Sequence, residues 1–90
     1  MNKEELVDQV ATDTGQTKKQ AMVTVDAVFA SITSALRRGE MVTVVGFGTF
    51  QVKRRAARDG RNPKTGDKIR IPSKQVPAFT AGKDLKAEVN

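Results

Sequence analysis

The sequence predicts an α+β fold, in which a helical N-terminal part is followed by antiparallel strands and a short terminal helix. Apolar residues recur every three or four positions through residues 18–38, which is the spacing of one helix face. β-Branched residues then dominate residues 41–45, and a second strand-like stretch follows at residues 49–55. A chain of 90 residues is short enough to form one domain, residues 1–90.

Residues 1–38 are predicted to form a helical hairpin. Asn2 has the spacing of an N-cap for a first helix over residues 3–13, and Gly15 marks the end of that helix. A second helix is expected over residues 18–38. The apolar stripe along this second helix consists of Met22, Val25, Phe29, Ile32 and Leu36.

Residues 41–52 and 75–80 are predicted to form the body of an antiparallel sheet. Gly46-Phe47-Gly48 is a tight-turn signal between the first two strands. Pro77 has no N–H donor, so its strand is expected at an edge of the sheet. Apolar residues four positions apart predict a short C-terminal helix over residues 83–89.

Residues 53–74 are predicted to form a hairpin arm. Turn-forming residues fill positions 60–66, where Asn62 and Pro63 suit the first two positions of a type I turn. Pro72 implies an edge position or a break in the returning strand. With roughly nine residues on each side, at about 3.4 Å per residue, the arm would be about 30 Å long. It has almost no apolar core of its own, so we expect it to be mobile without a ligand.

The positive charge of the chain is concentrated in this arm. The whole chain has a net charge of +6, whereas residues 53–74 hold nine cations and only two anions, Asp59 and Asp67. The rest of the chain holds seven cations and eight anions. Solubility alone would spread the charge, so the distribution favours a polyanionic ligand. The nine cations are Lys53, Arg54, Arg55, Arg58, Arg61, Lys64, Lys68, Arg70 and Lys74.

The apolar residues outside the arm predict a dimer. Small domains bury a low fraction of their surface, and a two-stranded ribbon is marginal in water. One protomer offers too little surface to cover the helix stripe and the phenylalanines, so a two-fold dimer with a shared core is favoured. The alternative is a monomer whose stripe packs only on the first helix. The predicted dimer core consists of Phe29, Ile32, Leu36, Phe47, Phe50 and Phe79.

The composition argues against several other classes of protein. The chain has no cysteine and no histidine. Disulfide frameworks, thiolate zinc sites, thiol nucleophiles and histidine acid–base catalysis are therefore excluded. No phosphate-binding loop or metal-ligand spacing is recognisable, so no enzyme activity, catalytic residue, metal, cofactor or small-molecule substrate is expected. No apolar run suits a signal peptide or a membrane span, which predicts a cytoplasmic protein without a membrane partner.

Duplex DNA is the polyanion that the arm suits best. All four phenylalanines lie outside residues 53–74, whereas proteins that bind single strands usually stack bases on aromatic side chains. A solvated cationic loop or a ribosomal-type tail remains an alternative, although the alternating strand pattern argues against a plain loop. Pro63 at the tip is either a wedge between base steps or a residue that only shapes the turn.

Four sequence blocks resemble the successive motifs of the HU/IHF family of bacterial histone-like DNA-binding proteins, over essentially the whole chain. They are Gly46-Phe47-Gly48-Thr49-Phe50, Gly60-Arg61-Asn62-Pro63-Lys64-Thr65-Gly66, Val76-Pro77-Ala78-Phe79 and Gly82-Lys83-Asp84-Leu85-Lys86. The resemblance implies an intertwined homodimer with a helical base, a three-stranded antiparallel sheet and protruding β-ribbon arms. It also implies largely sequence-independent binding, bending and compaction of duplex DNA in the bacterial nucleoid, with Pro63 as the wedge.

The resemblance also implies which residues bind DNA. The arm cations and the tip would contact the minor groove and the DNA backbone, while three lysines of the body would contact phosphates where bent DNA reaches it. The implied set is Lys3, Lys53, Arg54, Arg55, Arg58, Arg61, Asn62, Pro63, Lys64, Lys68, Arg70, Lys74, Lys83 and Lys86. Individually, Lys3, Lys83 and Lys86 are better explained as solvated surface lysines, because most surface lysines contact only water.

Two other functions remain open from the sequence. A site-specific relative of the IHF type resembles this chain in the arm, but such proteins act as heterodimers of two distinct subunits. An RNA-binding or ribosome-associated protein is the second alternative. Among duplex ligands, nicked or kinked DNA would be preferred, because it is already deformed and costs less to bend.

Overall fold

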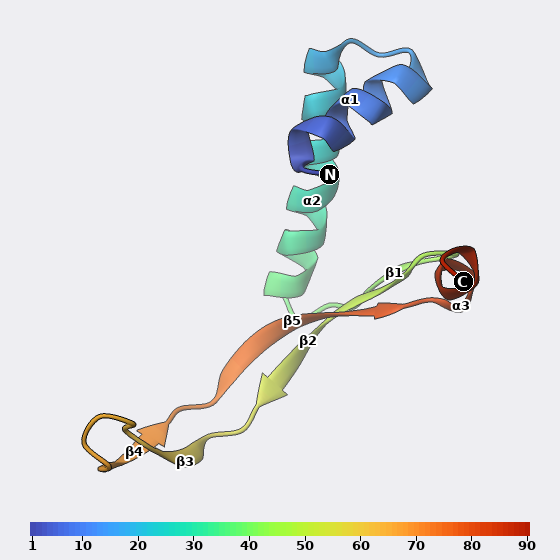
Figure 1. Ribbon diagram of the computed structural model, residues 1–90. Helices are drawn as coiled ribbons and strands as arrows, with labels where there is room; N and C mark the ends of the chain where they lie inside the picture. Colours follow the sequence, from blue (N-terminus) through green and yellow to red (C-terminus); the bar gives the residue numbers. More distant parts are fainter. The chain divides into compact units, whose positions relative to one another are not determined.

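The computed structural model describes residues 1–90 and confirms the α+β class (Figure 1). Contacts within the chain divide it into two compact units, residues 1–34 and 35–90, which we describe separately. The prediction of one domain remains a prediction. The elements are α1 (Lys3–Thr14), α2 (Lys18–Arg37), β1 (Val42–Val44), β2 (Gly48–Arg55), β3 (Arg58–Arg61), β4 (Lys68–Ile71), β5 (Lys74–Ala81) and α3 (Lys83–Glu88).

In the first unit, α1 packs on the N-terminal part of α2. The contact is centred on Val7, Ala21 and Val25, with Val10 and Ala11 partly buried against them. These residues recur at helical spacing on the two helices, so each helix presents one apolar face to the other. None of the helices in the structure has both the length and the apolar character that crossing a bilayer requires.

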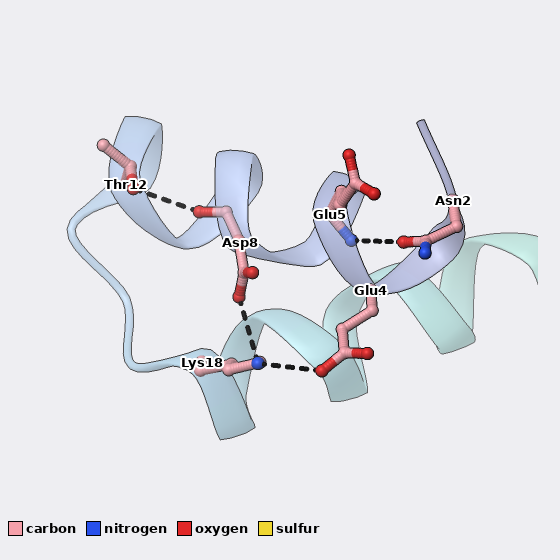
Figure 2. A network of polar contacts seen from close by, with 6 residues as sticks. All are labelled: Asn2, Glu4, Glu5, Asp8, Thr12 and Lys18. Atoms are coloured by element: carbon pink, nitrogen blue, oxygen red, sulfur yellow. Dashed lines mark hydrogen bonds and ion pairs between the residues drawn. The ribbon is translucent and has the colours of Figure 1, made fainter.

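Polar contacts position the start of each of these helices. Asn2 Oδ1 accepts a hydrogen bond of 2.8 Å from the Glu5 N–H, which caps α1 (Figure 2). Lys18 at the start of α2 lies 3.3 Å from the carboxylates of both Glu4 and Asp8 (Figure 2). Hydrogen bonding to these two carboxylates raises the pKa of Lys18. The charged lysine thus links the start of α2 to α1.

The second unit contains a three-stranded antiparallel sheet in the order β1–β2–β5. β1 is two residues shorter than the expected strand over residues 41–45. At its end, the Phe47 N–H donates to the Val44 carbonyl at 2.9 Å, and Gly46 adopts a left-handed φ of 83°. This conformation suits glycine and turns the chain into β2. Pro77 lies in β5, which is an edge strand, as predicted.

A small aromatic cluster lies on this sheet. The Phe79 ring centroid lies 4.8 Å from that of Phe50, its direct cross-strand partner, and 5.4 Å from that of Phe47. Gly48 gives the Phe79 ring room, because an added Cβ there would lie only 2.5 Å from Phe79 Cζ and 2.6 Å from the Thr80 carbonyl oxygen. The first and second glycines of the Gly-Phe-Gly motif therefore serve different purposes, one for backbone conformation and one for space.

The arm consists of two successive paired segments. β2 and β5 pair as far as Arg55 and Lys74, and β3 and β4 form a separate two-stranded sheet beyond them. The pairing is interrupted at residues 56–57 on one side and 72–73 on the other. Pro72 has no N–H to donate to a ladder bond, which accounts for the break that the sequence predicted there.

Candidate nucleic-acid interface

All nine cations of the arm are exposed. They extend along both of its sides, from the end of the body sheet to the tip loop, which comprises residues 62–67 (Figure 1). β2 holds Lys53, Arg54 and Arg55, β3 holds Arg58 and Arg61, the tip holds Lys64, β4 holds Lys68 and Arg70, and β5 holds Lys74. The structure thus brings these predicted binding residues together on one ribbon.

The strand register places like charges opposite each other at two points of the arm. Arg55 is the direct partner of Lys74, and Arg61 is the direct partner of Lys68. Direct cross-strand partners lie on the same face, and like charges in such positions are destabilising. An anion that binds between the members of each pair would remove this repulsion. The arm is therefore electrostatically suited to a polyanion.

One acidic residue lies in direct opposition to an arm cation. Arg70 Nη1 lies 3.1 Å from Asp59 Oδ1, and both side chains are exposed. This is the only ion pair of the arm, so its other eight cations are free of carboxylate partners. Asp67, the second acid of the arm, forms no ion pair. Of the two acids of the arm, Asp59 alone is therefore paired with an arm cation.

The opposite face of the β3–β4 ribbon carries Gly60, Ile69 and Ile71, together with one of the arm cations, Arg58. Gly60 pairs with Ile69 on this face, and an added Cβ at Gly60 would lie 2.9 Å from Ile71 Cδ1. The two isoleucines thus cover a glycine, which brings their side chains close to the backbone of β3. By sequence, Gly60 belongs only to the turn-forming residues 60–66, and its role beneath the isoleucines could not be predicted because it depends on the strand register.

The tip loop differs from the predicted type I turn. A type I turn that begins at Asn62 would be closed by an N–H three residues later. Instead, the Gly66 N–H donates to the Asn62 carbonyl at 2.7 Å, so the loop is one residue longer. Gly66 has a left-handed φ of 74°, which accommodates the extra residue. Pro63 is exposed within this loop, whereas Asn62 is half-buried.

The three predicted contact lysines of the body lie outside the arm. Lys83 and Lys86 are exposed on α3, which begins where the Gly82 N–H donates to the Phe47 carbonyl at 2.8 Å. Figure 1 shows α3 at the end of β2 and β5 that is remote from the tip. Lys3 belongs to the first unit and forms an ion pair with Asp26. No local sequence pattern indicates this ion pair, because it joins residues on two different helices.

The predicted dimer-core residues are incompletely covered within one chain. Phe29, Phe47 and Phe79 are 48%, 45% and 42% exposed. Ile32, Leu36 and Phe50 are half-buried. Val7 is the largest side chain that one chain buries completely. The monomer alternative required α1 to cover the whole stripe of α2, but α1 covers Val25 and leaves Phe29 exposed.

The structure contains no cluster of three or more potential metal ligands. A pocket of about 300 Å³ lies between the β1–β2 turn and the start of α3, with Val44, Thr49 and Asp84 in its walls. Its lining is mainly apolar and includes no arm residue. The arm, rather than this pocket, holds the concentrated charge.

Known proteins resemble the chain over its whole length. The family model described as "Bacterial DNA-binding protein" matches residues 1–90. DNA-binding protein HU of Geobacillus stearothermophilus is 56% identical over 89 residues, and HU of Staphylococcus aureus is 55% identical, each covering 99% of both chains. An HU–DNA cocrystal structure from Anabaena matches with a TM-score of 0.93 at 50% identity, over 99% of this chain and 97% of the other. HU from Thermotoga maritima matches with a TM-score of 0.73 at 37% identity, over all of both chains.

Proposed function

Because the chain belongs to the bacterial DNA-binding protein family, we propose that it is an architectural protein that binds and bends duplex DNA as a homodimer. Binding depends little on base sequence and is strongest where the duplex is already nicked or kinked. The HU relatives and the HU–DNA cocrystal structure support this function. So does the arrangement of charge on the arm.

The like-charge pairs of the arm are the observation that carries the proposal. Arg55 faces Lys74 and Arg61 faces Lys68 across the ribbon, with no carboxylate bound to any of them. Phosphates that bind there replace repulsion by attraction and release counterions from the DNA. Because every duplex presents the same phosphates, this interaction does not read base sequence.

We assign the arm and three body lysines to DNA contacts. The arm cations bind the backbone and line the minor groove, and four of them form the two like-charge pairs described above. The body lysines contact phosphates that reach the body once the duplex bends. The proposed contact set is Lys3, Lys53, Arg54, Arg55, Arg58, Arg61, Lys64, Lys68, Arg70, Lys74, Lys83 and Lys86, with Pro63 at the tip.

Pro63 is the wedge in this proposal. It is exposed at the tip and apolar, and it has no N–H that would need a hydrogen-bond partner. An apolar side chain inserted between base steps unstacks them and kinks the duplex. The bend then lets DNA cover more of the protein surface.

The homodimer is supported by the apolar surface of the single chain. Phe29, Phe47 and Phe79 would otherwise remain exposed to water, at a cost in free energy that grows with the apolar area. Dimerisation also supplies a second arm, so that two ribbons can hold one duplex. In this proposal the protein acts on the bacterial nucleoid in the cytoplasm and performs no catalysis.

A binding titration tests the function directly. Linear, nicked and four-way-junction DNA of matched length are each titrated with protein at several salt concentrations, and a duplex RNA serves as the comparison. We expect tighter binding to nicked and junction DNA than to linear DNA, and a steep salt dependence on all three. Equal or tighter binding to the duplex RNA would contradict the assignment to DNA. Discrimination between linear DNAs of different sequence would favour a site-specific protein instead.

A further inference from the structure

The tip loop is held closed by a set of hydrogen bonds centred on Asn62. Its N–H donates to the Asp67 carbonyl at 2.8 Å, and its own carbonyl accepts from the Gly66 N–H at 2.7 Å. Its side-chain oxygen, Oδ1, accepts from the Lys64 N–H at 2.9 Å. No other residue of the loop takes part in as many of these bonds.

The side-chain bond of Asn62 spans Pro63. Asn62 Oδ1 and the Lys64 N–H lie on either side of the proline in sequence, so the bond closes a small ring that contains the Pro63 backbone. The pyrrolidine ring already restricts the φ of Pro63. The remaining freedom at this position is in the ψ angles of Asn62 and Pro63. The ring closed by the hydrogen bond from the Lys64 N–H to Asn62 Oδ1 restricts both of these angles. Asn62 therefore orients the proline.

Two further contacts support the same loop. Thr65 Oγ1 accepts from the Asp67 N–H at 3.3 Å, and Arg61 Nη1 donates to the Gly66 carbonyl at 3.3 Å. Asn62 is half-buried in the loop, while Pro63 and Lys64 are exposed. The loop thus presents the proline outward and turns the oxygen of Asn62 inward.

We propose that Asn62 is a positioning residue, whose carboxamide oxygen orders the loop so that Pro63 is held ready for insertion into DNA. This inference rests on the proposed function and deepens it. The Oδ1 atom acts on the Lys64 N–H rather than on DNA. A disordered tip would lose conformational entropy when it inserts into DNA. By limiting the conformations of the free tip, Asn62 reduces this loss and so favours bending.

A matched pair of variants separates positioning from direct contact. Asn62→Ala removes the acceptor, whereas Asn62→Ser keeps an oxygen that can accept from the Lys64 N–H in the same kind of turn. The two variants differ by one hydroxyl oxygen, and both lack the amide N–H donors of asparagine. The serine hydroxyl can itself donate, so the separation rests on exchange of the Lys64 amide measured without DNA, where only an acceptor role toward that N–H has an effect.

The first measurement is made on the full chain without DNA. Solvent exchange of the Lys64 amide proton is measured by NMR in the unmodified protein and in both variants. We expect Asn62→Ala to speed this exchange about two- to tenfold, the effect of one net hydrogen bond, and Asn62→Ser to restore part of the protection. Unchanged exchange in Asn62→Ala would overturn the inference, because the side chain would then not order the loop.

The second measurement is the bend of a short linear duplex at saturation, read by energy transfer between its labelled ends. We expect Asn62→Ala to bend the duplex less than Asn62→Ser does, while both bind a nicked duplex almost as tightly as the unmodified protein. Equal loss of bending in the two variants, with exchange protection restored only by serine, would assign Asn62 to direct contact and overturn the inference. Failure of the unmodified protein to bend DNA would instead overturn the proposed function, and the exchange rates would still decide whether Asn62 orders the loop.

Discussion

Asp59 and Arg70 are direct partners across the β3–β4 ribbon, and their side chains form an ion pair of 3.1 Å. Both side chains are more than two-thirds exposed, so the pair contributes at most about 1 kcal/mol to stability. It lies next to the like-charge pair of Arg61 and Lys68. In the DNA-free protein, Asp59 therefore occupies the guanidinium that a phosphate would bind.

Asp59→Asn is expected to strengthen DNA binding by releasing Arg70. If Arg70 then neutralises one further phosphate, the slope of log affinity against log salt steepens by about 0.9. Asp67→Asn is the matched control, since it changes the net charge equally but breaks no ion pair. Titrations of both variants across salt concentrations measure the difference. Equal slopes would show that Asp59 acts only through net charge.

Replacing arm cations is expected to weaken binding without changing sequence preference. Each of Arg55→Gln and Arg58→Gln should reduce the salt slope by about 0.9, and the double variant by about twice as much. Lys19→Gln removes a positive charge from an exposed position on α2 to which no DNA contact is assigned, and serves as the control. A salt slope that stays constant in the double variant would remove these two residues from the interface.

Pro63→Ala is expected to separate bending from binding. The charge of the arm is unchanged, so affinity for nicked DNA should be largely retained. On an intact linear duplex, affinity and bend angle should both fall, because alanine is a smaller wedge and opening a base step costs a few kcal/mol. Energy transfer between the duplex ends reports the bend. If the variant bends linear DNA as the unmodified protein does, Pro63 only shapes the turn.

Phe79→Ala is expected to destabilise the dimer by about 3–5 kcal/mol, which is typical of a buried phenylalanine. Its ring contacts those of Phe47 and Phe50 within the chain, and its exposed part is available to a partner. Sedimentation should show less dimer, and the melting temperature should fall with it and depend on protein concentration. A folded monomer of the unmodified chain at micromolar concentration would contradict the dimer itself.

Gly48→Ala is expected to lower stability by about 1–3 kcal/mol through overpacking. The new methyl group would lie 2.6 Å from the Thr80 carbonyl oxygen, a backbone atom that cannot move aside without disturbing the pairing of β2 and β5. Thermal unfolding followed by circular dichroism measures the effect. A melting temperature equal to that of the unmodified protein would mean that the sheet adjusts without cost.

Much of the fold could be predicted because its signals are local. The capping contact of Asn2, the left-handed Gly15 after α1 and the apolar spacing of α2 each depend on residues within one or two turns of helix. The same is true of the break at Pro72, which follows from a missing N–H. The hydrogen bond from the Lys64 N–H to Asn62 Oδ1 is also predictable from the sequence, because an asparagine side chain commonly accepts from the N–H two residues ahead.

By itself, the sequence determined the α+β class, the order of helices and strands, and the concentration of nine cations in one ribbon, because these depend on composition and local periodicity. Only the tertiary structure decided that Asp59 holds Arg70, that Arg61 faces Lys68, and that Ile71 covers Gly60. These relationships depend on the strand register, and a shift of one residue would move every side chain to the other face. Register is settled by pairing between distant residues, so no local pattern could supply it.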